Sequence, residues 1–141
     1  GLAEKAGADT ILNPSRENAG EALRRMEPGG VDATLEMSGH PSSLPLALEH
    51  TRPGGRVSLL GVFPDVIDCF DLNKAIFKGL DLQGIVGRRL YATWDQMNWL
   101  LSEKGLDVTS VITNEMPFSE IEQAMQTLKA GQAGKIVLSF E

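Results

Sequence analysis

Three glycines recur at places where a predicted strand gives way to a loop. They stand in the triplets Met37-Ser38-Gly39, Leu60-Gly61-Val62 and Ile85-Val86-Gly87. A glycine at such a place lets a flat ring or a ribose approach the backbone, because it has no side chain. Any one of these glycines is more simply explained as a turn residue, and their recurrence at three strand ends only narrows the margin between that explanation and the wall of a nucleotide crevice. The sequence contains no Gly-x-Gly-x-x-Gly, so the pattern alone does not establish a dinucleotide site.

The other chemically versatile side chains have simpler explanations. His40 and His50 lack cysteine or carboxylate neighbours at ligand spacing, and we expect both to be surface residues without a role. Cys69, the only cysteine, cannot form an internal disulfide or a Cys-x-x-Cys metal site, and we interpret it as a small hydrophobe rather than a nucleophile. Trp94 and Trp99 are expected to pack. The sequence therefore offers no catalytic residue and no metal ligand.

Strands and helices alternate over the first part of the chain. The apolar patterns predict strands at 10–12, 31–37, 56–62 and 80–86. The polar positions Asp32, Thr34 and Glu36 indicate that the second of these strands is half exposed. Between the strands we predict a helix capped by Ser15 that runs to 26, a helix from Pro41 that stops before 53–55, and a short helix capped by Asp71 that buries Leu72, Ala75 and Ile76. This order implies parallel pairing through right-handed crossovers, hence a three-layer α/β domain that forms the C-terminal half of a doubly wound sheet.

The pattern changes beyond Gly87. We predict an amphipathic helix at 92–101 that buries Trp94, Met97 and Leu101, a strand at 111–113, a helix opened by a Ser119–Glu122 capping box and closed by Gly131, and a strand at 135–140. The domain boundary is expected between 87 and 90. Residues 2–7 fit either the last turn of a longer helix or a short frayed terminal helix.

Composition and charge narrow the class of protein. The chain has 141 residues, 42% of them hydrophobic, which is enough for one globular domain or for one domain and part of another. Its net charge of −6 argues against binding nucleic acid. No apolar run approaches the roughly 20 residues of a membrane helix, and nothing resembles a signal peptide. We expect a soluble cytoplasmic protein with no membrane contact.

Several segments resemble a known enzyme family. Residues 35–39 and 54–61 resemble strand regions of the zinc-dependent medium-chain alcohol dehydrogenases. Residues 76–80, 84–88 and Thr93-Trp94 are similar to the L-threonine 3-dehydrogenases among them, and so is the ending at 111–113, Phe118 and 130–138. The resemblance covers essentially the whole chain.

The resemblance implies a division of the chain and a cofactor site. Residues 1–88 would be part of an NAD-binding Rossmann domain, and residues 89–141 the C-terminal return segment of the catalytic domain. The positions that match NAD contacts of the family are Leu60, Gly61, Val62, Ile85 and Val86 on the nicotinamide side, Ser38 and Gly39 at a neighbouring strand end, and Lys135 towards the pyrophosphate.

The implied reaction is the oxidation of L-threonine to 2-amino-3-oxobutanoate, with hydride transfer to NAD and zinc as a Lewis acid. The family's zinc ligands and proton relay lie in upstream segments outside this sequence, so the chain alone is expected to be inactive. Strand 10–12 would lack its partner and strand 31–37 would expose an edge, so we expect proper folding only within a longer chain. The family also suggests a homo-oligomer, a tetramer paired through strand 80–86. Two alternatives stay open: another polyol or alcohol dehydrogenase, and a module that binds a nucleotide or a partner without catalysis.

Overall fold

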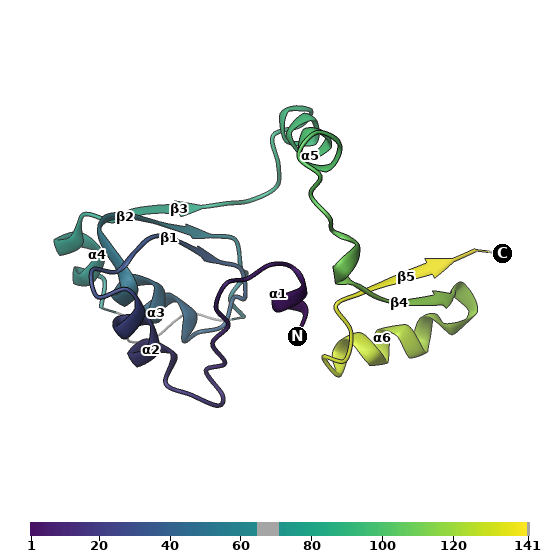
Figure 1. Cartoon of the computed structure of the whole chain (residues 1–141), viewed down its shortest axis with the longest axis horizontal. Coiled ribbons are helices and arrows are strands. Elements are labelled where there is room, and N and C mark those ends of the chain that lie inside the picture. The colour runs from purple at the N-terminus through teal and green to yellow at the C-terminus, as the bar shows by residue number, and fades with distance from the viewer. Residues whose placement is uncertain (65–70, 141) are drawn as a thin grey trace. The chain divides into compact units, whose positions relative to one another are not determined.

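The computed structural model describes residues 1–64 and 71–140 (Figure 1). These residues form two compact units. Residues 12–88 make up the three-strand unit, and residues 1–11 with 89–141 make up the two-strand unit. The units part between Arg88 and Arg89, and residues 1–11 group with the second unit.

A fully parallel sheet is the centre of the three-strand unit. Its strands are β1 (Val31–Glu36), β2 (Thr51–Leu59) and β3 (Asp81–Gly84), in the order β1-β2-β3. Glu36 pairs with Leu59, and Leu59 with Gly84, so the three carboxyl ends are in register. The predicted parallel α/β class is therefore confirmed.

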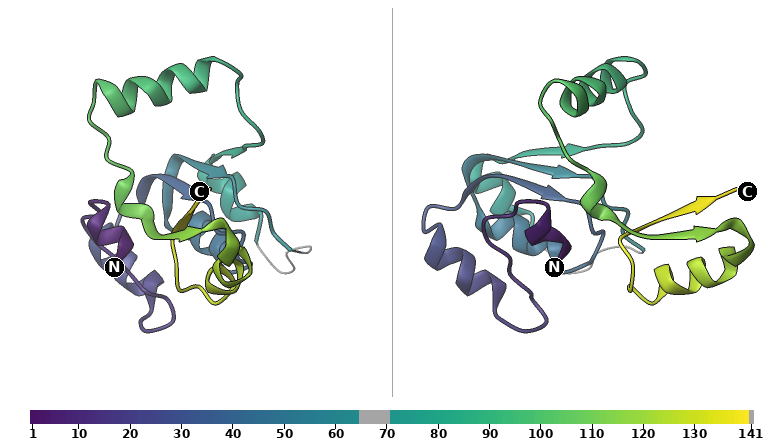
Figure 2. Two further views of the ribbon diagram at one scale, coloured as in Figure 1. Left: turned by 90° about the vertical axis from the view of Figure 1, so that its right-hand side faces the viewer. Right: turned by 45° about the vertical axis from the view of Figure 1, so that its right-hand side comes forward.

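Helices α2 (Ala19–Met26), α3 (Ser43–His50) and α4 (Asn73–Lys78) lie on one face of this sheet (Figure 2). Two successive right-handed crossovers that advance in the same direction must place their helices on the same side. Within the described residues this unit therefore has two layers, not the three we expected.

Hydrogen bonds to the first helical turns correct one predicted cap. Asn18, not Ser15, is the N-cap of α2, and its Oδ1 accepts a hydrogen bond of 3.1 Å from Glu21 N. Ser15 N instead donates to Asn13 Oδ1 at 2.9 Å, so Ser15 belongs to a preceding turn. Asp71 accepts from Asn73 N at 3.0 Å, one position ahead of the assigned N-cap of α4.

Strand boundaries differ from the prediction where pairing decides them. Residues 10–12 are not a strand, since no strand among the described residues lies beside them to pair. β2 begins at Thr51, which pairs with Val31, and the register then shifts so that Ala33 faces Arg56. Residues 53–55, expected to separate helix from strand, lie within this irregularity. β2 ends at Leu59 and β3 at Gly84, so residues 60–62 and 85–86 lie in the following loops.

The core of this unit is small and lies between α3, α4 and β2. Its buried members are Leu44, Ala47, Leu48, Val57 and Ala75. Two positions expected to be buried on α4, Leu72 and Ile76, are exposed because this helix has only six residues and turns only Ala75 fully inward. At the end of β1 the apolar side chain is exposed and the polar one is buried, the reverse of what we expected. Leu35 is 64% exposed, whereas Glu36 points to the helical side and is 4% exposed.

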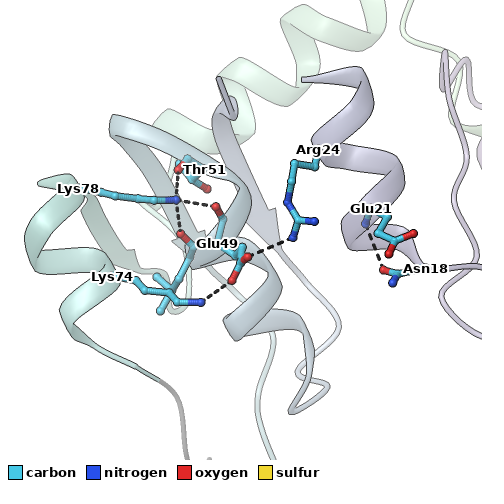
Figure 3. Close-up of polar contacts among 8 residues, drawn as sticks. Asn18, Glu21, Arg24, Glu49, Thr51, Lys74 and Lys78 are labelled. Carbon is cyan, nitrogen blue, oxygen red and sulfur yellow. Dashed lines mark hydrogen bonds and ion pairs between the residues drawn. The ribbon is translucent and has the colours of Figure 1, made fainter. Parts of the chain in front are cut away.

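Lys78 ties the end of α3 to the start of β2 (Figure 3). Its Nζ donates to three carbonyl oxygens, those of Leu48 at 2.9 Å, Glu49 at 2.6 Å and Thr51 at 2.9 Å. A cation suits this place because the last carbonyls of a helix have no intrahelical donor and carry partial negative charge. Beside it, the Glu49 carboxylate forms ion pairs with Lys74 and with Arg24. We call Lys78 and its three carbonyls the lysine clasp.

The two-strand unit contains one parallel strand pair joined by a helix. Its strands pair directly and α6 packs against both. The elements are α1 (Leu2–Lys5), α5 (Ala92–Ser102), η1 (Thr109–Val111), β4 (Ile112–Pro117), η2 (Phe118–Glu120), α6 (Ile121–Lys129) and β5 (Lys135–Ser139).

Two predictions for this unit are wrong. The Ser119–Glu122 capping box does not form, because η2 occupies residues 118–120. The N-cap of α6 is Glu120, which makes no side-chain hydrogen bond to the helix. Trp94, Met97 and Leu101, expected to be buried on α5, are exposed, and no residue of that helix is buried. In the part of the chain that the structure describes, no helix has the length and apolar character needed to cross a membrane.

Candidate functional site

The loops that follow β1, β2 and β3 lie at one edge of the three-strand sheet. Besides the strand register, Leu60 N donates to Glu36 O at 2.8 Å, and Ile85 N donates to Leu59 O at 2.8 Å. We call residues 37–39, 60–62 and 85–86 the strand-end rim. The prediction that the three strand ends lie side by side is confirmed, and seven of the eight predicted site residues belong to this rim.

Lys135, the eighth, is the first residue of β5 in the two-strand unit and is exposed.

Two of the three strand-end glycines are required by close approach of the backbones. A Cβ on Gly39, which has φ +65°, would collide with the backbone of Val62. A Cβ on Gly61 would collide with Gly39 N and with the Glu36 carboxylate. The third glycine, Gly87, has φ +64° but open space around it, so only its conformation favours glycine. The loops after β1 and β2 are therefore in contact through these two glycines.

The rim presents backbone and apolar groups. Val62 is 91% exposed and Val86 is 96% exposed, while Leu60 and Ile85 are each a little under half exposed. Apolar side chains beside glycine backbone are suited to a flat ring that needs stacking surface and a few hydrogen bonds. The residues present fit the nicotinamide half of a dinucleotide in this respect.

Glu36 is the residue of this site that sequence reasoning missed. Its Oε1 lies 2.9 Å from Ser38 N, 2.6 Å from Ser38 Oγ, 3.0 Å from Gly39 N and 2.8 Å from Ser43 Oγ. Burial raises the pKa of the Glu36 carboxyl, but the hydrogen bonds from Ser38, Ser43 and Gly39 lower it by more, so the pKa lies below its ordinary value. A glutamate followed by serine and glycine two and three positions later was the available signal, because those residues can donate back to the carboxylate.

A groove of about 510 Å³ runs along β1 beside α2 and α3 and reaches the rim at Met37 and Ser38. Leu23, Ala33, Leu35 and Leu46 are among its apolar lining residues. β1 pairs only with β2 in the described sheet, so this groove follows an unpaired strand edge.

The two histidines differ in their surroundings. His40 is exposed, and its Nδ1 lies 2.8 Å from Ser42 Oγ. His50 is 8% exposed, so its predicted place on the surface is wrong. Burial lowers the pKa of the His50 imidazole; the Glu49 carboxylate opposes this, while nearby cations add to it.

Among residues 1–64 and 71–140, no three His, Cys, Asp or Glu side chains are grouped as metal ligands would be. Cys69 lies outside the described residues.

Comparison with known proteins identifies relatives of the whole chain. A family described as zinc-binding dehydrogenase matches residues 1–103. An L-threonine 3-dehydrogenase of Idiomarina loihiensis is 38% identical over 99% of this chain and 41% of its own length. One from Yersinia pestis has the same identity and coverage. The predicted resemblance is thereby confirmed, and the chain spans about 41% of the length of these relatives.

Solved structures agree with the fold. The alcohol dehydrogenase of Thermus sp. ATN1 superposes with a TM-score of 0.86 at 27% identity, over 99% of this chain and 41% of that one. The L-idonate 5-dehydrogenase of Escherichia coli gives a TM-score of 0.77 at 28% identity, over 97% of this chain and 38% of that one.

Proposed function

The chain belongs to the zinc-binding dehydrogenase family, and from this premise we propose that it is part of an enzyme that oxidises L-threonine to 2-amino-3-oxobutanoate with NAD as the hydride acceptor. The 38% identity with L-threonine 3-dehydrogenases supports the choice of substrate. Because the chain spans about 41% of those relatives, the activity is proposed for the complete protein that carries these residues.

The observation that carries the proposal is the strand-end rim with its two touching glycines. Backbone groups of Leu60, Gly61, Val62, Ile85 and Val86 would hold the nicotinamide ring and its ribose, since a parallel sheet binds its ligand at the carboxyl ends of its strands. The contact between Gly39 and Gly61 brings two of these loops together at that edge. Ser38 and Gly39 would border the ribose. Lys135 would approach the pyrophosphate with its charge. Residues 12–88 would thus be part of the NAD-binding domain, and 89–141 the return segment of the catalytic domain.

NAD, once bound, would accept the hydride from the carbon that carries the substrate hydroxyl. The residues of this chain orient the ring and keep one face of it against apolar side chains such as Val62 and Val86. The rim residues supply no proton acceptor to the substrate, because none of them is ionisable.

The described residues do not fit a zinc site, since they group no three possible ligands. We propose that the zinc ligands belong to other parts of the complete protein.

The proposal is tested with the complete protein, purified and assayed for absorbance of NADH at 340 nm. L-threonine with NAD should give the highest kcat/KM in a panel that includes L-idonate, 2,3-butanediol and benzyl alcohol, each also tried with NADP. Binding of NADH without turnover of any of these substrates would instead support a non-catalytic nucleotide-binding module. Absence of NADH binding would refute the proposed site.

A second candidate, a zinc-dependent polyol or alcohol dehydrogenase, is favoured by the likeness to solved enzymes with those names. A preference for L-idonate or a simple alcohol over L-threonine in the same panel would select it.

We also propose a cytoplasmic homo-oligomer, a tetramer by family resemblance, in which subunits pair through β3. β3 pairs only with β2 in the described sheet, so its outer edge is available. Light scattering of the complete protein would measure the number of subunits.

A further inference from the structure

Glu36 places a buried negative charge directly beside the strand-end rim. Its side chain is almost entirely buried, and hydrogen bonds hold the pKa of its carboxyl below the ordinary value, so it is ionised near neutral pH. None of the ion pairs found among the described residues includes it. Burying a charge is costly unless it is compensated, and here dipoles rather than a cation provide the compensation. The charge itself is therefore left unneutralised at this edge of the sheet.

The two carboxylate oxygens face different loops. Oε1 takes all the hydrogen bonds, which come from Ser38, Gly39 and Ser43. Oε2 is buried with no hydrogen-bond partner among the residues that the structure describes. Oε2 points at Gly61, where an added Cβ would collide with it. The unsatisfied oxygen thus faces the loop proposed to hold the nicotinamide.

The same residue also fixes that loop through its main chain. The Glu36 carbonyl accepts hydrogen bonds from Leu60 N at 2.8 Å and Gly61 N at 3.1 Å. One residue therefore holds the loop after β1 with its side chain and the loop after β2 with its backbone.

A fixed negative charge distinguishes the two redox states of a nicotinamide. The oxidised ring carries a positive charge and the reduced ring is neutral, so only the oxidised ring gains Coulomb energy from a nearby anion. We propose that Glu36 is a positioning residue whose buried charge makes the strand-end rim bind oxidised nicotinamide cofactor in preference to the reduced form. This inference rests on the proposed function, which puts the nicotinamide at the rim.

A purely structural role would act on both redox states alike. Loosening the loop at 38–39 would weaken NAD and NADH by similar factors, since both use the same backbone groups. The ratio of the two dissociation constants therefore separates the charge from the hydrogen bonds.

The experiment measures Kd for NAD and for NADH on the complete protein by calorimetry, in the wild type and in Glu36→Gln. Glutamine keeps the size and can still accept at Oε1, but it removes the charge. We expect Kd for NAD to rise about three- to tenfold more than Kd for NADH. The matched control is Glu49→Gln, which removes a carboxylate near the start of β2, at the opposite end of that strand from the rim, and should change the ratio by less than about twofold.

A charge-retaining variant and a milder one keep the test decisive. Glu36→Asp should preserve the wild-type ratio within about twofold even if both constants rise, because the charge stays. If Glu36→Gln does not fold, Ser43→Ala serves as the second test. It removes one donor to Oε1 without changing the charge, so the preference for NAD should hold or increase.

Equal weakening of NAD and NADH in Glu36→Gln, or no weakening at all, would overturn the inference and leave the proposed function intact. The same holds for a fall in NAD preference in Ser43→Ala. A wild-type protein that binds neither cofactor would overturn the proposed function, and the inference with it.

Discussion

The lysine clasp should determine how often the end of α3 opens. In Lys78→Met the alkyl chain and helix propensity of α4 are kept, but the carbonyl oxygens of Leu48, Glu49 and Thr51 lose their donor. Each such hydrogen bond contributes about 0.5–1.5 kcal/mol net. Because the Lys78 side chain is only half buried, we take a total near the lower end, about 2 kcal/mol, which corresponds to roughly a 30-fold change in a local opening equilibrium.

Hydrogen exchange of the complete protein, followed by mass spectrometry on peptides that cover residues 43–51, measures this opening directly. The Thr51 amide, which donates to Ala47 O at the end of α3, should exchange about 30-fold faster in Lys78→Met. The matched control is Lys74→Met, which loses one ion pair to Glu49 between side chains that are about 40% exposed. Such a pair contributes at most about 1 kcal/mol, so exchange should rise no more than about fivefold. Similar exchange rates in the two variants would refute the reasoning that Lys78 acts as a helix cap.

Four further outcomes follow from the structure. Gly61→Ala should destabilise the complete protein by more than about 2 kcal/mol in thermal unfolding, because the added Cβ meets the backbone of the neighbouring loop. The control Gly87→Ala should cost about 1–2 kcal/mol, because Gly87 has open space around it but a φ of +64°. Leu48→Ala should lower the free energy of unfolding by about 2–5 kcal/mol, since it removes one of the few fully buried side chains. The folded-state pKa of the Glu36 carboxyl is lowered, so the ionised carboxylate stabilises the fold fully above the ordinary carboxyl pKa of 4.5. This stabilisation is lost as the pH falls through the folded-state pKa. The urea midpoint should therefore fall more between pH 6 and pH 3 in the wild type than in Glu36→Gln. The 141-residue chain alone should melt without a sharp cooperative transition in circular dichroism, because β1 has an unpaired edge and large apolar side chains are exposed, and a sharp transition from a monodisperse monomer would contradict this.

The strand-end rim could be predicted because its signals are local. Each strand has its own apolar run, and each ends on a glycine within three residues. Parallel pairing then brings those ends together, whatever the details of side-chain packing. The exact ends of the strands were less predictable, since β2 starts at Thr51 only because that residue can pair with Val31 across a register shift.

The environment of Glu36 could be predicted only in part. Its hydrogen bonds from Ser38 and Gly39 are local, but the donor Ser43 lies in the next helix and the contact with Gly61 comes from the loop after the next strand. The burial of His50 has a similar cause. It lies at the end of α3, where α2 packs against that helix, and only the packing of the two helices decides its exposure. Contacts with a second helix or with the next loop are not visible when only the neighbours in sequence are considered.

The composition of the rim limits which properties of the proposed enzyme this chain can control. Residues 37–39, 60–62 and 85–86 have no ionisable side chain, and Glu36, whose carboxylate lies against Gly61, is buried with one oxygen occupied by donors. Such a surface can set how tightly a cofactor binds and in which redox state, because both depend on fixed dipoles, apolar contact and a constant charge. It cannot exchange a proton with a substrate, since proton transfer needs a group that titrates within reach. The pH dependence of turnover must therefore come from residues outside the rim, whereas the affinity for cofactor responds to substitutions within it.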